Sequence, residues 1–135
     1  MRRLLVSLVV VACSFALVDR AQSAPPTTGT VNAVNGSGIS GKVQIHANKD
    51  GSSKITVRLS GLQFDTEYIA VWSTSPSCDV GTAPPLPTSV IGRFRGDAKG
   101  SARVTADLTA PADQIQSIAI QLANGLELVG CAPVQ

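Results

Sequence analysis

The sequence holds few side chains suited to acid–base, nucleophilic or metal chemistry. His46 is the only histidine in the 135 residues, and no Cys/His pair, Ser/His/Asp set or carboxylate cluster accompanies it. It lies in an alternating stretch and is expected to face solvent, where a lone histidine lacks the partners of a metal or catalytic site. Residues 48–51 resemble the start of a calcium loop, but Val57 occupies the place of the closing glutamate, so a turn is the better interpretation. We therefore predict no catalytic, cofactor-binding or metal-binding residue.

Four basic residues cluster on one predicted hairpin: Arg93, Arg95, Lys99 and Arg103. Alternation along the strands is expected to place the three arginines on the solvent side, where they could hold a sulfated or phosphorylated polymer. Asp97 and Asp107 lie close by and would partly cancel this positive field. A solvated sheet face is therefore the preferred interpretation of the cluster.

The segment "YIAVWSTSPSC", residues 68–78, combines two aromatic residues with a serine-rich loop. Tyr68, Ala70 and Trp72 are expected on one face of a strand, with Ile69 and Val71 on the other. Because both faces are apolar, the strand is predicted to be central in its sheet. Tyr68 and Trp72 could together form a stacking platform for a sugar or another flat ligand, and packing in the core is the alternative.

Period-two alternation of apolar and polar residues dominates the chain after residue 24 and predicts an all-β fold. Turn dipeptides at Asn35-Gly36 and Asp50-Gly51 separate the alternating segments. Eight strands are predicted near residues 30–34, 39–47, 54–60, 67–73, 90–95, 102–108, 117–122 and 126–131. Two longer connections, 74–89 and 109–116, join some of them. Short antiparallel strands with regular turns predict a sandwich or flattened barrel in a single domain, 24–135.

The N-terminal segment has the features of a secretory signal peptide. Arg2 and Arg3 precede an apolar run over residues 4–17, and the small-x-small motif of residues 21–23 predicts cleavage after Ser23. A competing interpretation is a bacterial lipobox that ends at Cys13, which would anchor the protein through a lipid. The apolar run is too short for a membrane span. We expect a secreted or periplasmic protein, with lipid anchoring through Cys13 as the alternative.

Removal of the predicted signal changes the charge balance. The full chain has 11 Lys+Arg and 9 Asp+Glu, and Arg2, Arg3, Arg20 and Asp19 lie before Ala24, so 8 residues of each sign remain. A neutral domain gives no electrostatic reason to expect a nucleic-acid partner or a membrane surface. The oligomeric state and the partner, a protein or a small molecule, are open at this point.

Cys78 and Cys131 are the two cysteines that remain after the predicted cleavage. In an oxidising compartment two such cysteines usually pair, and a reactive free thiol is the alternative. In the chain-entropy description, closing a loop of this length stabilises the fold by about 4 kcal/mol.

The order of these elements resembles the copper–zinc superoxide dismutase superfamily, including its small secreted bacterial relatives. The resemblance is carried by Gly61-Leu62 after an alternating strand, by "GRFRGDAKGSARVTADL" at 92–108 and by "ELVGCAPV" at 127–134. It implies an eight-stranded Greek-key sandwich with a disulfide between Cys78 and Cys131. The immunoglobulin-like chromophore carriers related to neocarzinostatin have a similar strand entry, but they carry two disulfides, and this chain can form only one after cleavage.

The resemblance also implies the loss of the metal site. An ungapped match places Ala70 and Trp72 where the enzymes carry an H-x-H pair of copper ligands, and Leu128 where they carry the active-site arginine. The 74–89 loop lacks the zinc ligands. We therefore expect an exported, non-catalytic sandwich protein with a binding or structural role. The alternatives are a small-ligand carrier that uses Tyr68 and Trp72, and a residual metal or redox-handling protein.

Overall fold

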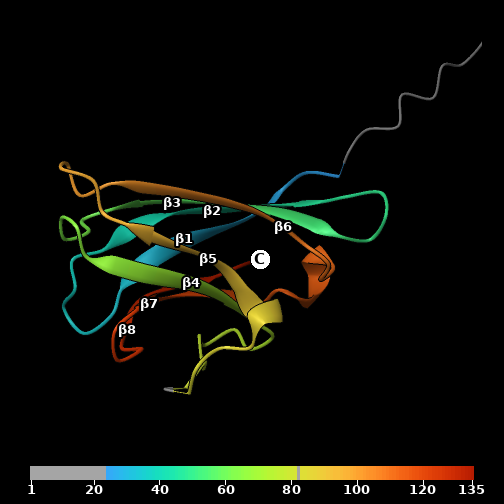
Figure 1. Ribbon diagram of the computed structural model, residues 1–135. Helices are drawn as coiled ribbons and strands as arrows, with labels where there is room; N and C mark the ends of the chain where they lie inside the picture. Colours follow the sequence, from blue (N-terminus) through green and yellow to red (C-terminus); the bar gives the residue numbers. More distant parts are fainter. Residues whose placement is uncertain (1–23, 82) are drawn as a thin grey trace, which may run out of the picture.

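The structure is a computed structural model that describes residues 24–81 and 83–135 (Figure 1). The predicted signal segment 1–23 and Cys13 lie outside the described residues, so cleavage and lipid anchoring stay predictions. In the part of the chain that is described, no helix is long and apolar enough to cross a membrane.

All eight predicted strands are present. Their bounds are β1 Thr27–Ala33, β2 Ser40–Ala47, β3 Ser53–Ser60, β4 Glu67–Ser73, β5 Val90–Arg95, β6 Ala102–Leu108, β7 Ser117–Leu122 and β8 Leu128–Pro133. Two single 3-10 turns, η1 (Pro87–Ser89) and η2 (Ala112–Gln114), lie in the two long connections. The fold is therefore all-β and antiparallel, as the alternation predicts.

The strands form two layers that share β1, in the order β5-β4-β7-β8-β1-β2-β3-β6. The first five residues of β1 pair with β2 and its last two pair with β8, so this strand passes from one layer to the other. Figure 1 shows β2, β3 and β6 as one layer facing β4, β7 and β8. Strands that are distant in the chain, β3 with β6 and β4 with β7, are neighbours, which is the Greek-key arrangement.

The core lies between the layers and is built by the inward half of each alternating strand. Val43 and Ile45 of β2, Ile55 and Val57 of β3, and Ile120 of β7 are at most 1% exposed. Their outward neighbours on β2 and β3 are mainly exposed. Burial of this apolar set, at about 25 cal/mol per Å², is the main stabilising contribution to the sandwich.

Two strand starts differ from the prediction by more than one residue. β1 begins at Thr27, three residues early, because the Pro/Thr-rich lead-in pairs its backbone with β2 as far as Ile45. β8 begins at Leu128 because Leu126 has a φ of 57°, a left-handed conformation that a strand cannot continue. The Asn35-Gly36 turn has positive φ at both residues, 54° and 68°, as its dipeptide predicts.

The predicted hairpin between residues 90–95 and 102–108 does not form a hydrogen-bonded ladder. β5 pairs with β4, and β6 pairs with β3 in the other layer. The connection over residues 96–101 crosses between the layers, with its turn closed by Asp97, whose carboxylate accepts N–H groups from Lys99 and Ser101. A tight turn between two alternating segments does not reveal which partner strand each segment takes.

Candidate functional site

Tyr68 does not lie on an accessible face. Its side chain is 2% exposed, and its ring stacks on Phe94 with the ring centroids 5.7 Å apart. The hydroxyl oxygen accepts the backbone N–H of Gln63 at 3.0 Å, so the polar end of the ring is also engaged. The predicted stacking platform of Tyr68 with Trp72 is therefore not formed, because alternation turns Tyr68 into the core.

Trp72 is partly buried at the end of the same strand. Its indole Nε1 donates to the carbonyl oxygen of Thr88 at 3.0 Å, which holds the end of the 74–89 connection against β4. The ring also borders a hollow of about 390 Å³ together with Leu86, whose side chain is 71% exposed. Of the predicted aromatic pair, Trp72 alone remains in contact with the surface.

The opposite face of β4 is also buried. Ile69 is 1% and Val71 is 2% exposed, and neither belongs to the core cluster between the layers. Residues 74–89 are here named the covering loop: Val71 borders a hollow lined by this loop, and Ile69 lies opposite Gln121, whose amide reaches the loop at Gly81. The predicted Cys78–Cys131 disulfide is present and joins this loop to β8, with the two Cα atoms 5.8 Å apart. Figure 1 shows the loop on the outer side of the β4–β7–β8 layer, here named the covered face.

Two buried polar side chains of β7 also fasten the covering loop. The Gln121 amide donates to the carbonyl oxygens of Gly81 at 3.2 Å and Leu126 at 2.9 Å. The Ser117 hydroxyl donates to the carbonyl oxygen of Ser75 at 2.6 Å. Both side chains are at most 1% exposed, so each hydrogen bond also spares a buried polar group the cost of desolvation. The predicted connection is thus a tightly held cover.

The donor set on β4 does not fit copper or zinc. Ala70 is fully buried in the core, and Trp72 offers only an N–H donor. His46 lies exposed on β2, in the other layer. Among residues 24–81 and 83–135, no group of three His, Cys, Asp or Glu side chains lies close enough to hold a metal ion.

The segment that resembles a calcium loop forms the β2–β3 turn. The Asp50 carboxylate accepts from the hydroxyl and the backbone N–H of Ser52. These hydrogen bonds, with the hydroxyl contributing most, hold the pKa of the exposed Asp50 carboxyl below its usual value of 3.8. The carboxylate stabilises a turn, as the sequence interpretation requires.

The predicted arginine cluster is divided between the two layers. Arg95 on β5 forms an ion pair with Asp65 at 2.9 Å and lies 3.9 Å from Glu67, and Arg93 is also 3.9 Å from Glu67. Arg103 lies on β6 in the other layer, directly opposite Arg58 of β3. The three arginines do not share one surface, because the strands that carry them do not pair.

The pairing register reveals a set of cations that sequence reasoning missed. Lys42 of β2 lies opposite Arg58 of β3, and Arg58 lies opposite Arg103 of β6. All three side chains are exposed. We name Lys42, Arg58 and Arg103 the basic row. Each was recognisable as an outward position of its strand, but the row exists only through the pairing of β3 with β6, which are separated by two other strands along the chain.

No family model matches the sequence, and no curated protein is similar to it in sequence. The fold, by contrast, is similar to solved structures of superoxide dismutase 5 from Candida albicans. One point mutant is 16% identical with a TM-score of 0.53, and the match covers 84% of this chain and 92% of the other. A second point mutant is 18% identical with a TM-score of 0.51 and coverages of 83% and 92%. The chain therefore has the superoxide-dismutase-like sandwich fold, rather than the immunoglobulin-like alternative.

Proposed function

We propose that this chain is an exported, non-catalytic member of the superoxide-dismutase-like fold that acts through binding or as a structural protein. One observation carries the proposal. The region of β4 where the resembled enzymes hold copper contains a core alanine, Ala70, and a tryptophan, Trp72, that holds the covering loop. A redox metal in such a site needs several imidazole or carboxylate ligands, and β4 supplies none there.

The covering loop supports the same proposal. On the covered face, Ile69 and Val71 are buried, and the covering loop is joined to β8 by the disulfide. The hollow that remains beside Trp72 is lined by a single carboxylate, that of Asp79, and by no histidine. The disulfide also supports export, because such bonds persist in oxidising compartments.

The proposal is tested by metal content and activity of the purified protein after incubation with Cu²⁺ and Zn²⁺ followed by gel filtration. We expect less than stoichiometric retention of either metal and no superoxide dismutation above that of a heat-denatured sample. Stoichiometric copper with dismutation activity would overturn the proposal. His46→Gln is the matched variant: retention that disappears in it would support the residual metal-handling alternative, with further ligands supplied by a partner chain.

The intact mass of the protein recovered from the exported fraction of its own host tests the localisation. A mass that matches residues 24–135 with one disulfide supports cleavage after Ser23. A diacylglycerol on Cys13 would instead show a lipid anchor, and an uncut chain in the cytosol would overturn export.

A small-ligand carrier is the second candidate function, and the hollow beside Trp72 and the exposed Leu86 supports it. Since Trp72 is the only tryptophan, its fluorescence reports directly on this hollow. Quenching by a flat apolar compound, absent in Leu86→Ser, would support the carrier function. An unchanged spectrum across a broad compound library would remove it.

A further inference from the structure

The basic row lies on the outer face of β1, β2, β3 and β6, here named the open face. Neighbouring strands in a sheet are about 4.8 Å apart, so the row from Lys42 through Arg58 to Arg103 extends over about 10 Å. Like charges directly opposite one another on a sheet repel and destabilise the pairing. A row of three exposed cations is therefore a feature that folding stability does not explain.

Among the residues that the structure describes, no carboxylate of the open face neutralises the row. In the described part of the chain, ion pairs are formed by Arg93 and Arg95 alone, in the other layer. Asp107 lies on the open face but is four residues from Arg103 along β6, about 13 Å at strand spacing, and it is directly opposite Lys54. That distance exceeds the screening length of about 8 Å at physiological ionic strength. The positive potential at the row is thus uncompensated locally.

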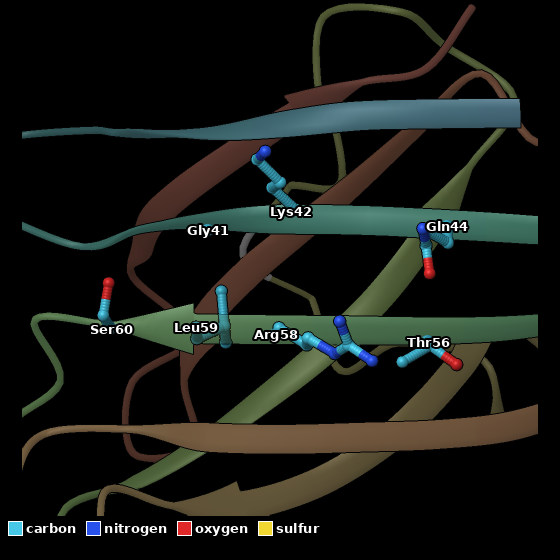
Figure 2. A pocket seen from close by; sticks show the side chains of 7 residues that line it. All are labelled: Gly41, Lys42, Gln44, Thr56, Arg58, Leu59 and Ser60. Carbon is cyan, nitrogen blue, oxygen red and sulfur yellow. The ribbon is translucent and has the colours of Figure 1, made fainter.

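Uncharged hydrogen-bonding groups flank the row. Thr30 lies opposite Lys42 at its β1 end. The next row, two residues along the strands, is Thr28, Gln44, Thr56 and Thr105. Between Lys42 and Arg58 the surface has a hollow of about 260 Å³, lined by Gly41, Lys42, Gln44, Thr56, Arg58, Leu59 and Ser60. Figure 2 shows the Lys42 and Arg58 side chains on neighbouring strands, with Gln44 and Thr56 beside them.

We propose that the open face binds a linear acidic polysaccharide, with its sulfate or carboxylate groups on the basic row and its hydroxyl groups on the threonine and glutamine row. The cations match repeated anionic groups because they form a line longer than one such group. The guanidinium groups of Arg58 and Arg103 each offer a planar fork of donors suited to sulfate or carboxylate. The neutral row supplies donors and acceptors for sugar hydroxyls.

The composition of the open face favours a polysaccharide over a single-stranded nucleic acid or a membrane. Binding of single-stranded nucleic acid relies on aromatic side chains that stack on bases, and membrane-surface binding relies on apolar anchors. Within residues 24–81 and 83–135, the large exposed hydrophobic side chains are Phe64 and Leu86. Phe64 lies between β3 and β4 and Leu86 in the covering loop, so neither is on the strands of the open face.

This inference rests on the proposed function in one respect, since an exported binding protein would meet such polymers outside the cell. Its test is independent of metal. Binding of the purified protein to dextran sulfate and to polygalacturonate, with neutral dextran as the control, is measured by titration calorimetry at low and at physiological ionic strength. We expect binding to both acidic polymers that weakens as salt rises, and none to neutral dextran.

Two matched double variants locate the site. Arg58→Gln with Arg103→Gln is expected to weaken binding about tenfold or more at low ionic strength, because two of the three cations of the basic row are lost. Arg93→Gln with Arg95→Gln removes the same two charges from the other layer and is expected to leave affinity unchanged. Thermal unfolding of both variants verifies that each is folded.

Each other outcome overturns the inference. Equal loss in the two double variants would mean attraction by overall charge, and no loss in either would place binding elsewhere. Tighter binding of single-stranded DNA or of phosphatidylglycerol vesicles through the same arginines would assign the face to another partner. Failure to bind either acidic polymer overturns this inference but leaves the proposed function standing, whereas dismutation activity would overturn the proposed function alone.

Discussion

The two layers of the sandwich share one core but differ in their outer faces. On β3 of the open face, the outward residues Lys54, Thr56 and Arg58 lie in the alternating pattern of a half-solvated strand. On β4 of the covered face, the outward residues Ile69 and Val71 are as buried as the core. A strand that carries aromatic residues and is apolar on both faces is therefore as consistent with a covering segment on its outer face as with a ligand platform.

The arginines show the same contrast. Arg93 and Arg95 lie beside Glu67 and Asp65, so the β4–β5 edge is locally neutral. Lys42 and Arg58 lie beside further cations and neutral residues. The fold therefore separates compensated arginines from uncompensated ones, although they are similar in sequence context. Only the second group can attract an anionic partner.

The largest expected effect concerns the disulfide of the covered face. Replacing both cysteines, Cys78→Ser with Cys131→Ser, is expected to lower the free energy of unfolding by about 4 kcal/mol, because the unfolded chain regains the freedom of a loop that spans 53 residues. Urea denaturation measures the change, and reduction of the unmodified protein is the control. Unchanged urea midpoints would show that the covering loop needs no disulfide.

The next effect compares matched outward positions of the two faces. Ile69→Ala is expected to cost about 2–5 kcal/mol, because it removes buried methyl groups beneath the covering loop. Gln44→Ala, at an exposed position of β2, is expected to change stability by about 0.5 kcal/mol or less. Chemical denaturation of both variants measures the difference. Similar values for the two would erase the distinction between a covered and an open face.

A smaller effect separates the two groups of arginines. Arg95→Gln is expected to destabilise the protein by less than about 1 kcal/mol, since exposed ion pairs contribute little. Arg58→Gln is expected to stabilise it by a few tenths of a kcal/mol, since it removes opposed like charges. Both changes should shrink as salt is raised. Thermal unfolding at two ionic strengths measures both changes. If both variants were destabilised, or both stabilised, the distinction between the two groups of arginines would be contradicted.

The smallest effect concerns the turn that joins β2 and β3 of the open face. The lowered pKa of Asp50 means that its carboxylate stabilises the fold above the unfolded-state pKa, and that this contribution is lost as pH falls through the folded-state pKa. We expect Asp50→Asn to have a slightly lower thermal unfolding temperature than the unmodified protein near neutral pH. We expect this difference to vanish in acid. Ser52→Ala removes the main donor and should show the same pH dependence. A pH-independent difference would mean that hydrogen bonding to the charged carboxylate is not its cause.

The strands, most of the turns and the candidate cysteine pair can be read from the sequence alone. In segments such as residues 54–60 and 102–108, period-two alternation decides which face of the strand turns to the core. The opposite orientation would expose all the apolar side chains of the strand to water. The Asn35-Gly36 turn is likewise local, because its dihedral angles follow from those two residues. Residues 24–135 contain one cysteine pair, so Cys78–Cys131 was the one disulfide this segment could form, with a free thiol as the alternative, and the structure contains the disulfide.

Which strands are neighbours, and therefore which side chains meet, depends on the three-dimensional fold. Alternation states that Arg58 and Arg103 face outward, but their opposition depends on the pairing of β3 with β6, which is non-local. The same reason explains why Arg93 and Arg103 separate and why Tyr68 stacks on Phe94 in the core. Alternation is a property of one strand, whereas a site on a sheet is a property of several strands held in register by long-range hydrogen bonds.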